Sequence, residues 1–149
     1  MAAEGFKTLL RVSDVRGQRL ARAASDARDA ADAALAAMHA AEDAEAAART
    51  ALTEARVVFA ATPACRQTRL WLDCTIDRAT AAKAATADAQ VRADMARDAH
   101  AEAVRAVARH RLRGDTLTAH HGALVRAERR RTEDRQEADA AVPSPMRMR

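Results

Sequence analysis

The sequence predicts an all-α protein, a long two-helix antiparallel coiled-coil hairpin, on three observations. More than a quarter of the 149 residues are alanine, the best helix former, and only four glycines and three prolines interrupt the chain. Apolar residues recur at alternating steps of four and three in the first half, which is the heptad pattern of a left-handed coiled coil. Pro63 separates the two halves and disfavours helical geometry at the residue before it.

The first predicted helix covers residues 7–61. Its heptad positions from residue 20 form a seam with one polar member, Glu45, which either fixes the register or reaches out to solvent; we favour solvent. The seam consists of Leu20, Ala24, Ala27, Ala31, Ala34, Met38, Ala41, Glu45, Ala48, Leu52, Ala55 and Phe59. Upstream, an apolar face is expected to continue across Gly17 through Phe6, Leu9, Leu10, Val12 and Val15.

A turn at residues 62–64 and a second helix at about 65–140 follow. Thr62 is expected to be the N-cap of the second helix and Pro63 its first residue, since proline is favoured there. The large apolar residues of this helix do not fall on one stripe, so the sequence does not predict its register.

Gly114 leaves the topology open, because it is able to end a helix that Asp115 would restart, giving a break at 113–116. One hairpin over residues 1–141 is the first alternative, a three-helix bundle reversing at Gly114 the second, and a kinked rod that dimerises the third. An alanine-lined seam favours the hairpin, because its volume is too small for the centre of three helices. In a hairpin Gly17 lies level with Gly114. Residues 142–149 are predicted to be a disordered tail.

Several classes of protein are excluded by what the chain lacks. No run of 18 apolar residues is present, so no membrane span is predicted, and the N-terminus lacks the apolar block of a signal peptide. We therefore expect a cytoplasmic protein. Cys65 and Cys74 would lie about 13 Å apart on one helix, beyond disulfide reach, and are predicted to be reduced thiols.

The sequence also predicts that the protein is not an enzyme. The four glycines are isolated and form no phosphate-binding loop, and the five histidines lack the spacing of a zinc site. Neighbouring acidic residues have arginines at helical spacing and are interpreted as surface ion pairs. No catalytic, cofactor-binding or metal-ligating residue is therefore predicted.

The excess of positive charge, +4 for the whole chain, falls in the C-terminal third. Its most basic part is RAERRRTEDRQEADA, residues 126–140, where acidic residues dilute the positive field and no aromatic residue is available to stack on a base. Three interpretations remain open: nucleic-acid binding, which the acidic residues disfavour, a solvated helix end, and a docking surface for acidic groups of a protein partner.

A chain that is nearly all helix, breaks near its midpoint and ends in RRRTEDRQEADA resembles the stalk proteins of type III secretion systems, the YscO/SctO family, and their flagellar relative FliJ. The likeness covers the layout of the whole chain. It implies a non-enzymatic central stalk without cofactors, which links the hexameric export ATPase to the cytoplasmic ring of the export gate. The stalk would be cytoplasmic and peripheral to the inner membrane through the secretion apparatus.

The resemblance also implies partner-binding residues. Contact with the export gate is expected from an apolar stripe early in the second helix, Leu72, Ile76 and Ala79, with Trp71 as the aromatic anchor of the contact. The alternative is structural: Phe59, Leu70 and Trp71 would form an apolar plug at the turn. Contact with the ATPase is expected from Arg126, Arg129, Arg130, Arg131 and Arg135. Secretion chaperones are further candidate partners, whereas nucleic acid and direct membrane insertion are not expected.

Two other functions compete with the stalk. A self-associating coiled-coil scaffold would sediment as a dimer or larger. A binder of nucleic-acid or membrane surfaces would lose affinity steeply with salt.

Overall fold

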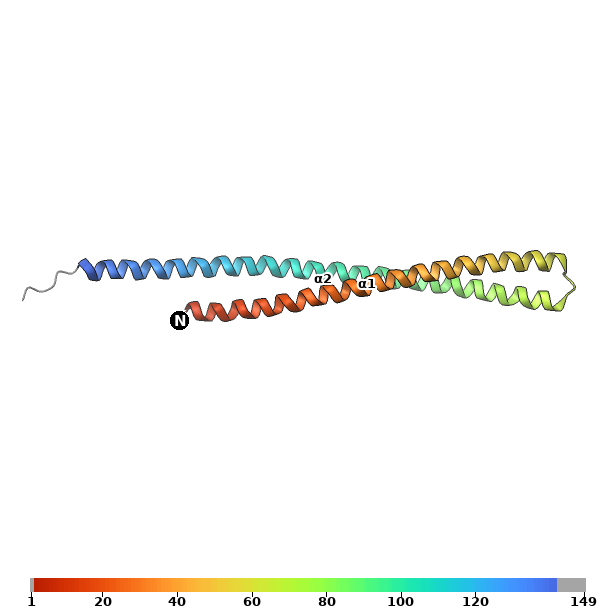
Figure 1. Ribbon diagram of the computed structural model, residues 1–149, viewed down its shortest axis with the longest axis horizontal. Coiled ribbons are helices and arrows are strands. Elements are labelled where there is room, and N and C mark those ends of the chain that lie inside the picture. The colour runs from red at the N-terminus through yellow and green to blue at the C-terminus, as the bar shows by residue number, and fades with distance from the viewer. Residues whose placement is uncertain (1, 142–149) are drawn as a thin grey trace, which may run out of the picture. The chain divides into compact units, whose positions relative to one another are not determined.

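A computed structural model of the protein describes the backbone of residues 2–141 and the side chains of residues 5–140. This part of the chain forms two helices, α1 (Ala2–Ala61) and α2 (Arg66–Ala141), and contains no strand (Figure 1). The predicted all-α helical hairpin is confirmed. Helix α1 begins before the expected residue 7, and the tail predicted at residues 142–149 lies outside the described residues.

Contacts between residues divide the chain into two compact units, and each unit contains a segment of both helices. The turn unit comprises Arg22–Arg105, and the terminal unit comprises Met1–Ala21 with Ala106–Arg149. Within each unit, a segment of α1 and a segment of α2 run side by side in opposite directions (Figure 1). The two units are described separately below.

In the turn unit, the α1 seam is the one predicted from the heptad pattern. From Ala24 to Phe59, each predicted seam residue is buried or half-buried, while most of the residues between them are exposed. Ala55 is wholly buried and Glu45 is 8% exposed. Alanine at these positions lets the two backbones approach closely, because its side chain is one methyl group.

The α2 seam of the turn unit follows the same alternation of four and three, with several polar members. Its residues are Thr68, Leu72, Thr75, Ala79, Ala82, Thr86, Ala89, Ala93, Ala96, His100 and Ala103. The threonines fit because their hydroxyls donate to backbone carbonyls. Thr75, for example, donates to the carbonyl oxygens of Trp71 at 3.0 Å and Leu72 at 2.8 Å. A threonine bonded in this way offers its methyl group to the seam.

In the terminal unit, the seam contains small and polar residues. Helix α1 contributes Phe6, Leu10, Ser13, Gly17 and Leu20, and α2 contributes Val107, His110, Gly114, Leu117 and His121. The expectation that Leu9, Val12 and Val15 continue the seam is wrong, because all three are exposed. They lie outside the four-three alternation that Phe6, Leu10, Ser13 and Gly17 follow.

Helix α2 passes through Gly114 without the break considered at 113–116. The glycine has no positive φ angle, and a methyl group built on it would lie 4.0 Å from the Ser13 hydroxyl oxygen. A reversal of the chain at this point, and the three-helix bundle that it would create, are therefore not formed.

The turn begins differently from the prediction. Thr62 ends α1: its amide donates to the carbonyl oxygens of Val58 and Phe59, each at 3.1 Å, and its hydroxyl donates to Val58 at 2.9 Å. Cys65 then precedes α2, and its carbonyl oxygen accepts the first helical bond from the Arg69 amide at 3.3 Å. The turn thus covers residues 62–65, one more than expected, and Thr62 is not the N-cap of α2.

Candidate partner-binding surfaces

The turn unit contains a polar layer, formed by Glu45, Arg49 and Thr86, in an otherwise alanine-rich seam. The Arg49 guanidinium donates to the Glu45 carboxylate. The Thr86 hydroxyl beside the same carboxylate, together with Arg49 and the charge of Lys83, holds the pKa of Glu45 below its ordinary value. The Thr86 hydroxyl also lies 3.1 Å from the Ala41 carbonyl oxygen of α1. The expectation that Glu45 reaches out to solvent is wrong, since both helices contribute to its environment.

Exposed apolar side chains gather beside the turn, on both helices. We define the tip surface as Val57, Val58, Leu70 and Trp71, which are 66%, 40%, 56% and 39% exposed. Because Leu70 and Trp71 remain exposed, they do not form the apolar plug with Phe59 that was considered as the structural alternative. A small hollow of about 250 Å³ adjoins Trp71 and is lined also by Cys65, Gln67 and Thr68.

The four residues predicted to contact the export gate do not form one stripe. Leu72 and Ala79 are half-buried members of the α2 seam, whereas Trp71 and Ile76 are exposed. Trp71 and Ile76 are five residues apart, which separates their directions by about 140° around the helix axis. They therefore lie on opposite flanks of the seam, and only Trp71 belongs to the tip surface.

The thiol of Cys65 lies beside backbone amides at the start of α2. The Thr68 and Gln67 amides at the start of α2 hydrogen-bond its sulfur and lower the pKa of the Cys65 thiol. Such amides have no partner within the helix and favour negative charge at this end. Cys65 and Cys74 are both free and exposed.

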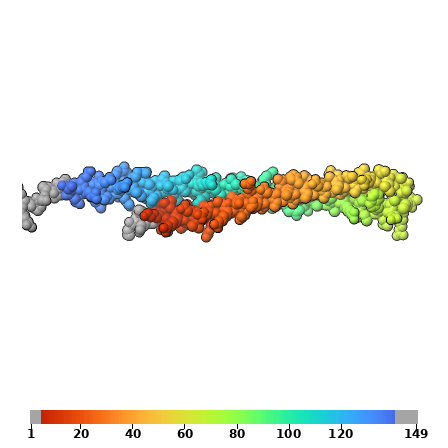
Figure 2. Space-filling model, in the orientation of Figure 1, coloured from red at the N-terminus to blue at the C-terminus, as the bar shows by residue number. Residues whose placement is uncertain are grey.

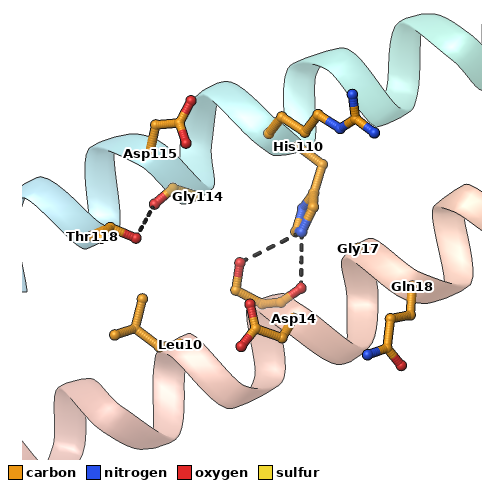
Figure 3. A pocket seen from close by; sticks show the side chains of 10 residues that line it. Leu10, Asp14, Gly17, Gln18, His110, Gly114, Asp115 and Thr118 are labelled. Carbon is orange, nitrogen blue, oxygen red and sulfur yellow. Dashed lines mark hydrogen bonds between the residues drawn. The ribbon is translucent and has the colours of Figure 1, made fainter.

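The terminal unit has a hollow of about 520 Å³ between its two helix segments (Figure 3). Small residues create it, because Gly17, Gly114 and Ser13 leave the seam underfilled. His110 reaches from α2 into this space, and its Nε2 lies 2.9 Å from the Ser13 carbonyl oxygen and 3.5 Å from the Ser13 hydroxyl (Figure 3). The nitrogen donates to the carbonyl, which can only accept. Asp14, Arg111 and Asp115 also line the hollow.

A second histidine lies further along the same seam. The His121 ring stacks on Phe6 with 5.8 Å between ring centroids, and its Nε2 is buried without a hydrogen-bond partner. An unpartnered buried nitrogen lowers the stability of the pairing. The terminal unit thus combines a hollow with an unsatisfied polar atom.

Beyond the start of α1, α2 continues alone within the terminal unit (Figure 2). We define the end segment as residues 126–140. Arg126 and every residue from 128 to 140 are exposed, so all five arginines predicted to contact the ATPase are exposed. The segment brings together Arg126, Arg129, Arg130, Arg131 and Arg135 with Glu128, Glu133, Asp134, Glu137 and Asp139.

The described residues hold no cluster of three or more potential metal ligands. None of the helix segments described is apolar enough over a sufficient length to cross a membrane. Comparisons of the chain with protein-family models, with curated proteins and with solved structures found no match.

Proposed function

We propose that the protein is a non-enzymatic stalk of a type III protein secretion apparatus. In this proposal the end segment binds the hexameric export ATPase, and the tip surface around Trp71 binds the export gate. The single observation that carries the proposal is the end segment: a charged helical stretch whose residues from 128 to 140 are all exposed. The layout of the sequence, which resembles that of the YscO/SctO stalk proteins, supplies the identity of the partners.

The distribution of charge on the end segment supports a partner that surrounds it. Arg126, Arg129 and Arg130 lie within about 100° of one another around the helix, and Arg131 and Arg135 lie on the opposite side. Five acidic residues are interspersed among them. A flat partner would contact one side only, whereas a ring of subunits would contact all sides. In that arrangement each subunit meets different side chains, so ring and stalk bias each other's states.

Association with the ATPase is tested by reversing charge in the end segment. The variant Arg129→Glu, Arg130→Glu, Arg131→Glu is expected to lose co-purification with the export ATPase of the same cell and any stimulation of its activity. The matched control, Arg66→Glu, Arg78→Glu, Arg92→Glu, changes the net charge equally at exposed residues of α2 in the turn unit. Equal binding by all three proteins would overturn this part of the proposal.

Contact with the gate is tested at Trp71, since large aromatic residues concentrate interface energy. The double variant Leu70→Ala, Trp71→Ala is expected to weaken retention on the immobilised cytoplasmic ring of the gate at least tenfold. The control is Val91→Ala, Met95→Ala, at two exposed apolar residues of the same helix and unit. Unchanged retention of the tip variant, or equal loss in the control, would refute the contact. Sedimentation as a stable dimer would favour a self-associating scaffold instead.

A further inference from the structure

The first turns of α1 carry a second apolar face that the hairpin does not use. Leu9, Val12 and Val15 are 55%, 60% and 49% exposed. They follow one another at steps of three residues, which keeps them within about 120° around the helix. The seam residues Phe6, Leu10 and Ser13 pack toward α2. Val12 and Val15 point away from α2, while Leu9 lies exposed at the flank of the seam.

Basic side chains lie beside and between these apolar residues. Arg11 and Arg19 are exposed on the outward half of the helix with Val12 and Val15, and Arg16 is exposed beside Leu9 at the flank of the seam. Among the described residues, none of these three arginines forms an ion pair. Between residues 5 and 21 the chain has four basic residues, Lys7 among them, and one acidic residue, Asp14. We call Leu9, Arg11, Val12, Val15, Arg16 and Arg19 the outer basic face.

We infer that the outer basic face binds the surface of membranes that contain anionic lipids. A helix with apolar residues on one side and Lys or Arg beside them lies in the plane of the membrane interface, with the apolar side chains below the headgroups. Arginine suits this position, because its aliphatic stem lies along apolar surface while its guanidinium reaches the phosphate groups. The positive charge of the face complements the negative charge of the headgroups.

Other occupants explain less of the face. A nucleic acid would use the arginines but would leave Leu9, Val12 and Val15 against water, and the face has no aromatic residue to stack on bases. A protein groove would cover the apolar residues but would also need acidic groups beside all three arginines, and α2 already occupies one side of the helix (Figure 2). A membrane with anionic lipids supplies apolar and negatively charged groups together over one side of the helix. The contact is peripheral, since no described helix is apolar enough to span a bilayer.

The test uses the full-length protein and co-sedimentation with vesicles of phosphatidylcholine, with or without phosphatidylglycerol. Binding is expected only where phosphatidylglycerol is present. Each basic side chain near an anionic surface contributes about fivefold to affinity, so Arg11→Gln, Arg16→Gln, Arg19→Gln is expected to weaken binding about a hundredfold. Replacing Leu9, Val12 and Val15 together by Gln is expected to weaken it about tenfold or more. Circular dichroism should show unchanged helix content, because these side chains lie outside the seam.

The matched control removes the same charge elsewhere. Arg66→Gln, Arg78→Gln, Arg92→Gln, at exposed residues of α2 in the turn unit, should bind vesicles as the unaltered protein does. Absence of binding to phosphatidylglycerol vesicles would overturn the inference, as would equal loss in the control. It would also be overturned if the apolar variant bound vesicles normally, or if duplex DNA competed for the face and its binding depended on the arginines alone.

Discussion

The turn unit and the terminal unit have seams of the same spacing but different chemistry. In the turn unit the seam is mainly alanine, and all the residues classed as buried lie there: Glu45, Ala55, Thr75, Ala89 and Ala93. In the terminal unit no described residue is buried to this degree, and glycine, serine and histidine leave a hollow of about 520 Å³. Spacing decides which residues meet, whereas side-chain volume and hydrogen bonding decide how firmly they hold.

Enlarging a tightly packed residue should have the largest effect on stability. Ala55 has no exposed surface, so Ala55→Leu inserts a larger side chain into a closely packed position. This variant is expected to reduce the free energy of unfolding by about 1–3 kcal/mol. Urea unfolding followed by circular dichroism measures the change. Ala60→Leu, at an exposed position of the same helix, is the control and should stay within about 0.5 kcal/mol of the unaltered protein. Equal effects would show that the turn-unit seam is not close-packed.

In the terminal unit, adding a methyl group should have the opposite effect. Gly114→Ala is expected to stabilise the protein by about 0.5–1 kcal/mol, because glycine weakens a helix interior and the new methyl would lie 4.0 Å from the nearest side-chain atom. Gly17→Ala should gain less, because its methyl would lie 3.1 Å from His110 Nε2 and the ring would have to shift. Thermal unfolding of the two variants compares them directly; a larger gain at Gly17 would contradict the geometry of the hollow.

The polar layer of the turn unit predicts a dependence on pH. Since Thr86 and Arg49 lower the pKa of Glu45 in the folded protein, the carboxylate stabilises the fold at pH values above its ordinary pKa of 4.5. This stabilisation should disappear as the pH falls through the lower folded pKa. The difference in unfolding free energy between the unaltered protein and Glu45→Gln should therefore be largest near neutral pH and shrink in acid. A difference that grew in acid would show that the layer favours the protonated form.

The smallest effect concerns Cys65, where reactivity changes while stability should not. In a Cys74→Ser background, the alkylation rate of Cys65 should reach its half-maximal value at a pH below the ordinary thiol pKa of 9.0. The same chain in denaturant is the control, because unfolding removes the Thr68 and Gln67 amides from the sulfur. An identical pH profile in the two conditions would mean that the start of α2 does not activate the thiol.

The fold class and the α1 seam of the turn unit could be predicted because they depend on apolar periodicity. The register of α2 could not, since Thr68, Thr75, Thr86 and His100 occupy seam positions that a search for large apolar residues passes over. Their hydroxyls are satisfied by helix carbonyls, as Thr75 illustrates. Large apolar residues such as Val91 and Met95 are exposed instead. The α2 seam follows the same alternation of four and three as α1. Carrying this alternation across the turn, so that it begins again at Thr68, would have identified the α2 seam.

The candidate surfaces were predictable in part. The arginines of the end segment, singled out by the local excess of positive charge and by the resemblance to stalk proteins, are exposed, whereas Trp71, Leu72, Ile76 and Ala79 divide between the seam and its two flanks. The stripe was chosen by spacing and resemblance, without the register that places Leu72 and Ala79 against α1. The outer basic face was missed for a related reason: Leu9, Val12 and Val15 were assigned to the seam, although Ser13 and Gly17 occupy it.

Hydrogen–deuterium exchange of the full-length protein tests the contrast between the two seams most directly. Amides of residues 38–55 and 72–89, in the turn unit, should exchange more slowly than those of residues 6–17 and 110–121, in the terminal unit, because opening the underfilled seam needs less free energy. Slower exchange in the terminal unit, or equal protection in the two units, would contradict the claim that alanine packing holds one seam more firmly than glycine and histidine hold the other.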